Sequence, residues 1–173
     1  MKKKLAVQIG FVIFLSWNLV SAQDQLKIGH VNIAEIVKAM PESDSAQNSL
    51  ESDSNEFRSM LEDMQVEYNK KLIEYQENID SYSQVIRKTK ETELVELQNR
   101  IQEFQQNATQ QLQQRNLELM QPIYNKIQAA IDKVATKLEF TYILDISNGS
   151  VVFTSDDSQN INSLVLNELG VNQ

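Results

Sequence analysis

The stretch from Phe57 to Ile86, FRSMLEDMQVEYNKKLIEYQENIDSYSQVI, decides the fold. Its large apolar side chains recur in steps of three or four residues, at Phe57, Leu61, Met64, Tyr68, Leu72, Tyr75, Ile79, Tyr82 and Ile86. The mean step is about 3.6 residues, the period of an α-helix, so these side chains form one narrow stripe. We predict a long helix whose stripe packs against another helix, close to the seam of a coiled coil.

A second stripe follows an interval without apolar side chains. Residues 87–93 read RKTKETE, and the periodic apolar positions then resume at Leu94 and continue to Leu138. Two arms of similar length predict an antiparallel helical hairpin over residues 43–138, with its tip near 87–93. Each arm spans roughly 65–70 Å at about 1.5 Å per residue. One unbroken helix is the alternative, because no strong helix breaker stands in the interval.

The composition excludes many kinds of site. The chain of 173 residues has four Gly, two Pro, one His and no Cys, with 24 acidic and 16 basic side chains. Without Cys there is no thiolate metal site, iron–sulfur cluster, disulfide or thiol nucleophile. The scarcity of Gly argues against phosphate-binding loops and dinucleotide folds.

The first 22 residues predict a secretory signal peptide. Three lysines at positions 2–4 precede an apolar run, and Val20-Ser21-Ala22 is a small-residue pattern that predicts cleavage after Ala22. An uncleaved anchor helix is the alternative, although the run is short for a span of roughly 20 residues. Loss of the three lysines changes the formal net charge from −8 to −11. We expect an exported protein with no stable membrane span after cleavage.

A small β-rich body is predicted from the two ends of the mature chain, residues 23–42 and 139–173. Residues 27–33, 141–146 and 151–154 favour strands, and Asn148-Gly149 between the last two favours a β-hairpin. Short helices are expected at 34–40 and 161–169, and the arm at Ser43 or Asp44. The fold class is therefore α+β and mostly α. So small a body favours oligomerisation, for which the candidate residues are Ile28, Val31, Ile33, Tyr142, Leu144, Ile146, Val151 and Phe153.

The arm carries three groups of candidate functional residues. Aromatic and Met side chains of the stripes either form only the seam or also offer an adaptable contact surface; they are Phe57, Met64, Tyr68, Tyr75, Tyr82 and Phe104. A basic cluster near the expected tip comprises Arg87, Lys88 and Lys90. Pro122 removes one backbone hydrogen bond within the returning arm, and we expect it to be a hinge or a tolerated kink.

No constellation of residues indicates catalysis, a cofactor or a metal. His30 has no second His or Cys to accompany it, and we expect it on the polar face of a strand. Asp145 and the pair Asp156-Asp157 are more simply explained as turn residues than as an acid–base pair. An acidic chain also binds nucleic acid poorly, because neutralisation of phosphates dominates that affinity.

The mature chain resembles the OmpH/Skp family over essentially its whole length. The resemblance rests on an N-terminal signal, a Lys27-Ile28-Gly29-x-Val31-x-Ile33 strand, Pro41 before a helical hairpin, Pro122 in the returning arm, and Ile127-x-x-Ala130-Ile131-x-x-Val134-Ala135 running into Tyr142-x-Leu144-Asp145. The family implies a periplasmic homotrimer with three helical tentacles around a cavity. Unfolded outer-membrane β-barrel precursors are held there without ATP.

Two features depart from the family. Its well-known members are strongly basic, whereas this mature chain is acidic, so binding of lipopolysaccharide or anionic lipid does not carry over. Asn160-Ile161-Asn162 replaces the Asp-Ile-Thr-like start of the last helix. The resemblance predicts a holdase chaperone, not an enzyme and without a cofactor. The alternative is an exported coiled-coil spacer or adaptor of the cell envelope that holds no unfolded protein.

Overall fold

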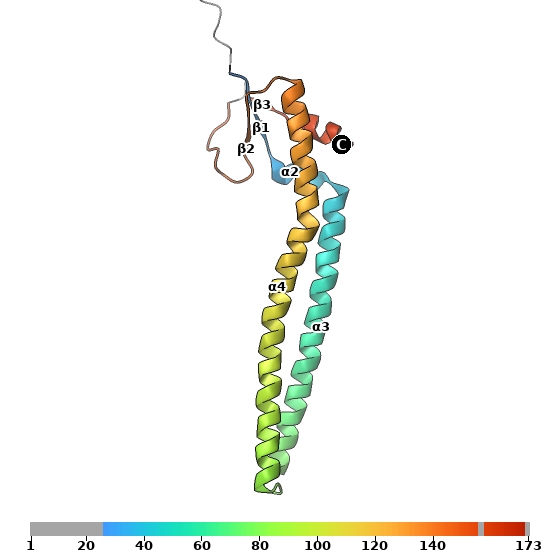
Figure 1. Cartoon of the computed structure of the whole chain (residues 1–173), viewed down its shortest axis with the longest axis vertical. Helices are drawn as coiled ribbons and strands as arrows, with labels where there is room; N and C mark the ends of the chain where they lie inside the picture. Colours follow the sequence, from blue (N-terminus) through green and yellow to red (C-terminus); the bar gives the residue numbers. More distant parts are fainter. Residues whose placement is uncertain (1–25, 156–157, 172–173) are drawn as a thin grey trace, which may run out of the picture.

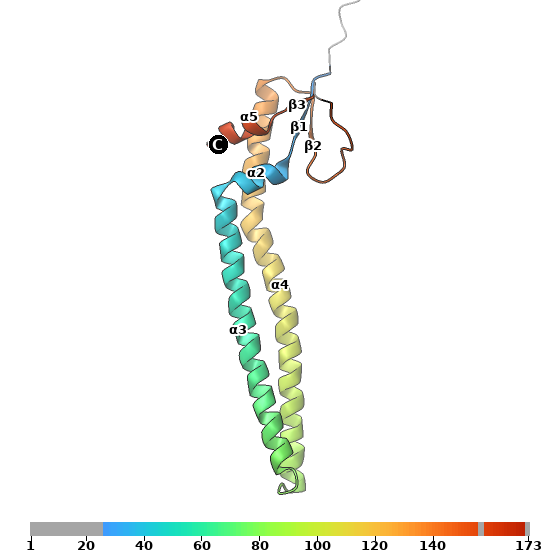
Figure 2. The same cartoon turned by 180° about the vertical axis from the view of Figure 1, so that it is seen from behind.

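The fold is known from a computed structural model that describes residues 26–155 and 158–171. The predicted signal peptide and its cleavage site after Ala22 lie outside these residues. The elements are β1 (Ile28–Val31), α2 (Ile33–Ala39), α3 (Pro41–Asn78), α4 (Gln84–Lys137), β2 (Tyr142–Asp145), β3 (Gln159–Asn160) and α5 (Asn162–Glu168). Helices α3 and α4 form a slender arm, and the other elements gather at one end of it (Figure 1; Figure 2 gives the reverse view). The predicted mostly helical α+β fold is confirmed.

The arm is a helical hairpin and not one continuous helix. Its tip lies at residues 79–83, between the end of α3 and the start of α4. The tip expected at 87–93 is wrong, because those residues belong to the first turns of α4. The side chain of Ser83 caps α4 by accepting a hydrogen bond from the Ile86 amide. The run without apolar side chains is therefore a solvent-facing part of a helix and not a turn.

The body end of the arm also begins earlier than predicted. Helix α3 starts at Pro41, immediately after Met40 as its N-cap, and not at a cap formed by Ser43 or Asp44. Proline suits the first helical position because its missing N–H would have no intrahelical partner there. The 38 residues of α3 span about 57 Å at 1.5 Å per residue.

The three strands form a parallel sheet in the order β2-β1-β3. The predicted β-hairpin around Asn148-Gly149 is wrong, because residues 151–154 form no strand. The local turn is nevertheless present, since Gly149 has a φ of 73° and Asn148 Oδ1 accepts from the Ser150 amide at 2.9 Å. The chain beyond β2 then crosses to the far edge of β1, where the short strand β3 pairs instead.

The core of the body contains side chains from the sheet, from α2, α5 and both helices of the arm. Strand β1 supplies Val31, and five of the core residues belong to the last four turns of α4: Ile123, Ile127, Ala130, Ile131 and Val134. Pro122 lies within α4 and immediately precedes the first of them. The body and the arm therefore share one helix, and Pro122 marks the position where α4 enters the core.

Candidate functional site

Five of the six predicted contact residues of the arm belong to the facing stripes of α3 and α4, and Tyr82 lies in the tip between the two helices. All six are half-buried: Phe57, Met64, Tyr68, Tyr75, Tyr82 and Phe104. Phe57 and Phe104 meet edge to face with ring centroids 6.1 Å apart, and Tyr75 stacks on Tyr82 at 6.4 Å. Their first contribution is to join the two helices, and only part of each side chain remains available to another molecule.

The third of the arm next to the tip is closed by buried side chains and by polar pairs. Leu94, Leu97 and Ile101 of α4 are buried there. Lys90 Nζ lies 3.0 Å from Glu74 Oε1, and this contact lowers the pKa of the Glu74 carboxyl and raises the pKa of Lys90.

A tyrosine adds a second polar link across the same part of the seam. The Tyr75 hydroxyl donates to Glu91 Oε1 at 2.7 Å, and this hydrogen bond raises the pKa of the phenol. Lys71 and Glu93 form a longer ion pair at 3.7 Å one turn further from the tip. These exposed pairs fix the register of the two helices more than they stabilise them.

The basic cluster predicted at the tip is not a free cationic patch. Arg87 is half-buried in the first turns of α4 and donates through Nη2 to the carbonyl of Ile79 at 2.8 Å. It thereby satisfies a carbonyl at the end of α3. Lys90 is engaged by Glu74, and of the three predicted residues only Lys88 is exposed. The cluster is therefore largely part of the structure of the hairpin.

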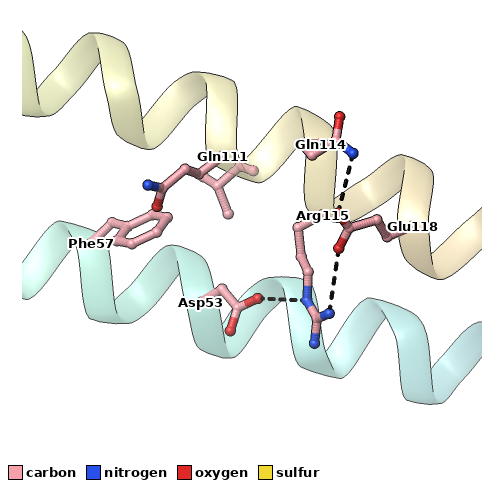
Figure 3. Close-up of a pocket in the computed structure, with 7 residues that line it drawn as sticks. Asp53, Phe57, Gln111, Gln114, Arg115 and Glu118 are labelled. Atoms are coloured by element: carbon pink, nitrogen blue, oxygen red, sulfur yellow. Dashed lines mark hydrogen bonds and ion pairs between the residues drawn. The ribbon is translucent and has the colours of Figure 1, made fainter.

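Midway along the arm the seam is open on both sides. Between Ile101 and Ile123 no residue of α4 is buried. A groove of about 470 Å³ lies on one side of the seam, lined by Ser54, Phe57, Arg58, Leu61, Phe104, Gln105, Ala108, Thr109 and Leu112. A groove of about 270 Å³ lies on the other side, lined by Asp53, Phe57, Gln111, Leu112, Gln114, Arg115 and Glu118 (Figure 3). Phe57 and Leu112 line both grooves, so these two side chains separate them.

Sequence patterns missed seven exposed apolar side chains of the arm. These residues lie off the stripes and are between 45% and 76% exposed: Met60, Val66, Ile73, Val85, Val95, Leu117 and Tyr124. These exposed side chains could have been predicted from the sequence, because they are apolar residues outside the stripe of a predicted coiled coil. Such a residue gains nothing from the seam and remains in contact with water.

The candidates for oligomerisation divide into buried and exposed groups. Val31 is 1% exposed and Ile33 packs against the same core, so both serve the single chain. Ile146 and Val151 are half-buried. The remaining candidates are exposed to extents between 42% and 81%: Ile28, Tyr142, Leu144 and Phe153. Ile28 and Tyr142 are directly paired across β1 and β2, so three of them share one sheet face.

His30 was expected on the polar face of its strand, but its ring is 7% exposed. Its Nδ1 lies 2.8 Å from the Ser158 hydroxyl, which satisfies one ring nitrogen. Among the described residues, no group of three His, Asp or Glu side chains is placed to hold a metal ion. Within the same residues, no helix has the length and apolar character needed to cross a membrane.

A family model described as "Outer membrane protein (OmpH-like)" matches residues 27–169, which include β1, the whole arm and α5. The chain belongs to the OmpH-like family. This assignment confirms the resemblance inferred from the sequence. No curated protein sequence matches the chain.

A solved structure shares the OmpH-like fold. It is a proposed outer membrane chaperone (OmpH-like) from Caulobacter crescentus CB15, which superposes with a TM-score of 0.71 over 82% of each chain. Only 12% of the aligned residues are identical. The likeness therefore establishes the shared architecture of body and arm and not the residues that act.

Proposed function

We propose that the mature chain is an ATP-independent holdase of the periplasm that binds unfolded outer-membrane β-barrel proteins and prevents their aggregation. The observation that carries the proposal is the series of exposed apolar side chains along a thin two-helix arm. Membership of the OmpH-like family and the likeness to a proposed outer membrane chaperone support it. The predicted signal peptide supports the compartment.

The distribution of these side chains suits holding without folding. Val66 and Val95 lie far from the body on α3 and α4, whereas Leu117 and Tyr124 lie close to it. Each contributes a small apolar contact. Because these contacts lie on one arm, a client segment bound at one of them meets the neighbouring ones at a high effective concentration. A bound chain can therefore remain associated while each single contact exchanges rapidly. Release needs no nucleotide, because a client that folds elsewhere withdraws its apolar side chains.

We further propose that the chain acts as a homotrimer assembled through its body. Strand β2 is one edge of the sheet, and an unpaired edge is a ready site for strand pairing between chains. Ile28, Tyr142 and Leu144 add exposed apolar surface on the adjoining sheet face, and Phe153 adds more in the following loop. Three arms joined at such a body would surround a shared cavity.

We propose Pro122 as the hinge of each arm. It leaves the Glu118 carbonyl without an intrahelical donor, at the position where α4 leaves the core. The ion pair between Lys126 and Glu42, at 2.8 Å, lies on the body side of this position. The substitution Pro122→Ala should narrow the range of client sizes that the protein keeps soluble. An unchanged range would show that the proline is a tolerated kink.

The decisive experiment dilutes a urea-unfolded outer-membrane barrel into buffer with and without the mature protein. We expect equimolar trimer to suppress light scattering, and sedimentation of the free protein to give the trimer mass. A variant with Val66, Ile73, Val95 and Leu117 changed to Ser should lose suppression while keeping its helical content. A matched variant with four exposed polar residues of the same helices changed to Ser should retain it. Absence of suppression by the wild-type protein would favour the envelope spacer.

A further inference from the structure

The two sides of the mid-arm seam differ in charge. The helical period places Asp53, Glu56, Met60, Asp63 and Glu67 in one row along α3, in steps of three or four residues. On α4 the facing row is Arg100, Glu103, Asn107, Gln111, Gln114 and Glu118. Asp53 and Glu118 line the smaller groove, so both rows border that side of the seam (Figure 3). We call these two rows the acidic rows.

The acidic rows are poorly neutralised. They contain six carboxylates against one cation, Arg100, and the one cation that lines the groove itself is Arg115. Arg115 Nε lies 3.3 Å from Asp53 Oδ2, and its Nη1 lies 3.8 Å from Glu118 Oε2 (Figure 3). The other four carboxylates make no ion pair within the described residues: Glu56, Asp63, Glu67 and Glu103.

The opposite side of the same seam is close to neutral. Its row on α3 is Glu51, Ser54, Arg58 and Glu62, and Ser54 and Arg58 line the larger groove. On α4 that groove is bordered by Gln105 and Thr109. The two sides of the α3–α4 seam therefore differ in charge, and a charged ligand would bind them with different affinity.

We propose that the acidic side of the mid-arm groove is a subsite for cationic, aromatic segments of unfolded clients. An aromatic side chain would rest against Phe57 and Leu112, and lysine or arginine neighbours would face the acidic rows. The exposed side chain of Met60 adds an adaptable apolar contact within the α3 row. Charge complementarity favours a cationic segment at this site, because the six carboxylates of the acidic rows would repel an acidic segment. The inference rests on the proposed holdase function and names the segments that the arm selects.

The first test uses short, acetylated and amidated fluorescent peptides with the full mature protein. One peptide has two phenylalanines flanked by lysines, a second has glutamates in place of the lysines, and a third has serines in place of the phenylalanines. Fluorescence anisotropy at low ionic strength should show the first peptide binding at least about tenfold more tightly than either of the others. Its affinity should decrease as salt is added, since the charges are exposed. Equal affinity for the lysine and glutamate peptides would overturn the proposal.

Matched variants on α3 locate the subsite. The double substitution Glu56→Gln and Glu67→Gln removes two charges from the acidic side, and we expect about fivefold weaker binding of the lysine peptide. The control, Glu51→Gln with Glu62→Gln, removes the same charge from the neutral side and should change affinity less than about twofold. All four glutamates are exposed, so both variants should keep the fold, and circular dichroism checks this. An equal loss in both variants would show that only net charge matters and would overturn the proposal.

Two further measurements distinguish the subsite from an interface between copies of the chain and from the holdase function itself. If the groove were such an interface, the variant of the acidic side would change the sedimenting mass, and that result would overturn the proposal. The barrel-dilution assay tests the holdase function independently with an unfolded protein. Suppression of aggregation without preference for the lysine peptide would reject the subsite and leave the proposed function standing. Preference for the lysine peptide without suppression of aggregation would reject the proposed holdase function and leave the subsite standing.

Discussion

The body and the arm are packed in different ways although they share α4. In the body, Ile36, Ile161 and Val165 are completely excluded from solvent. Along the whole of α3, the only described residue that is buried is Ala46, in its second turn. The body thus has an interior and the arm has only a seam. An arm with so little interior can yield to a bound chain while the body keeps its shape.

The largest test of this contrast compares two truncations on the same helix. Ile127→Ala removes a side chain that is 1% exposed in the body, and we expect a loss of about 2–4 kcal/mol in the free energy of unfolding. Leu112→Ala removes a half-buried side chain of the mid-arm seam, where the cost should be about 1 kcal/mol because grooves already border it. Urea unfolding followed by circular dichroism measures both. Equal losses would mean that the arm has an interior comparable to that of the body.

Gly29 gives a second test, of how closely the elements of the body approach one another. A Cβ atom at this position would lie 2.8 Å from a ring carbon of Phe140 and 3.2 Å from the backbone oxygen of Gln159. The backbone oxygen has little room to move, so Gly29→Ala should cost about 1–3 kcal/mol. An exposed glycine with open space, such as Gly149, gives the comparison, although its φ of 73° also penalises alanine. Unchanged stability of Gly29→Ala would show that the body is looser than its burial suggests.

The arm was predicted well from the sequence because a helix is specified by residues that are close together in the chain. A stripe with a period of 3.6 residues specifies a helix from its own side chains, and both helices were found in this way. The position of the tip was less accessible, since residues 87–93 differ from the rest of α4 only in lacking apolar side chains. The Ser83 cap and the neighbouring Asp80-Ser81 were the better turn signal.

The sheet was predicted less well because strand pairing is not local. Val152 and Phe153 have high β propensity, yet they are 95% and 81% exposed and belong to no strand. Gln159 and Asn160 have little β propensity and still pair with β1. Tertiary structure determines which segment pairs with β1, because the chain after β2 continues through a loop to the other edge of β1.

The candidate site shows the same division. The stripes identified most of the seam residues, whereas Ile79 and Tyr82 lie in the tip and Ile86 is 46% exposed. The grooves beside Phe57 could not be inferred from the sequence, because they depend on how closely two distant segments approach. The charge of the acidic rows was visible in the sequence, but which residues border the same groove required the register of α3 against α4.

A third test concerns the helix ends in the body, where one position is strained. Glu139 follows α4 with a φ of 56°, and the Phe140 amide donates to the Ala135 carbonyl across it at 3.0 Å. Gly170 occupies the equivalent position after α5, with a φ of 74°. Glycine suits this conformation because it has no Cβ, so Glu139→Gly should raise the free energy of unfolding by about 0.5–1 kcal/mol. A decrease would mean that the Glu139 side chain contributes a favourable contact.

The smallest expected effect concerns pH at the tip end of the arm. The pKa of Glu74 is lowered by Lys90, so the stabilisation from their pair is present above the ordinary carboxyl value of 4.5 and is lost as the pH falls through the lowered value. The pKa of Lys90 is raised by Glu74, so the same stabilisation is present below 10.5 and is lost only as the pH rises through the raised value. Amide hydrogen-exchange protection in the tip turns should therefore be constant near neutral pH and should fall below about pH 4.

The variant Glu74→Gln separates this pair from the general effect of acid. Its tip should lose protection slightly at pH 7 and should show less additional loss on acidification than the wild-type tip, while amides of the body respond identically in both proteins. An identical acid response at the two tips would mean that the buried side chains Leu94, Leu97 and Ile101 hold this end of the arm without help from the ion pair. In that case the contrast between a packed tip and an open middle of the arm would not depend on the pair between Glu74 and Lys90.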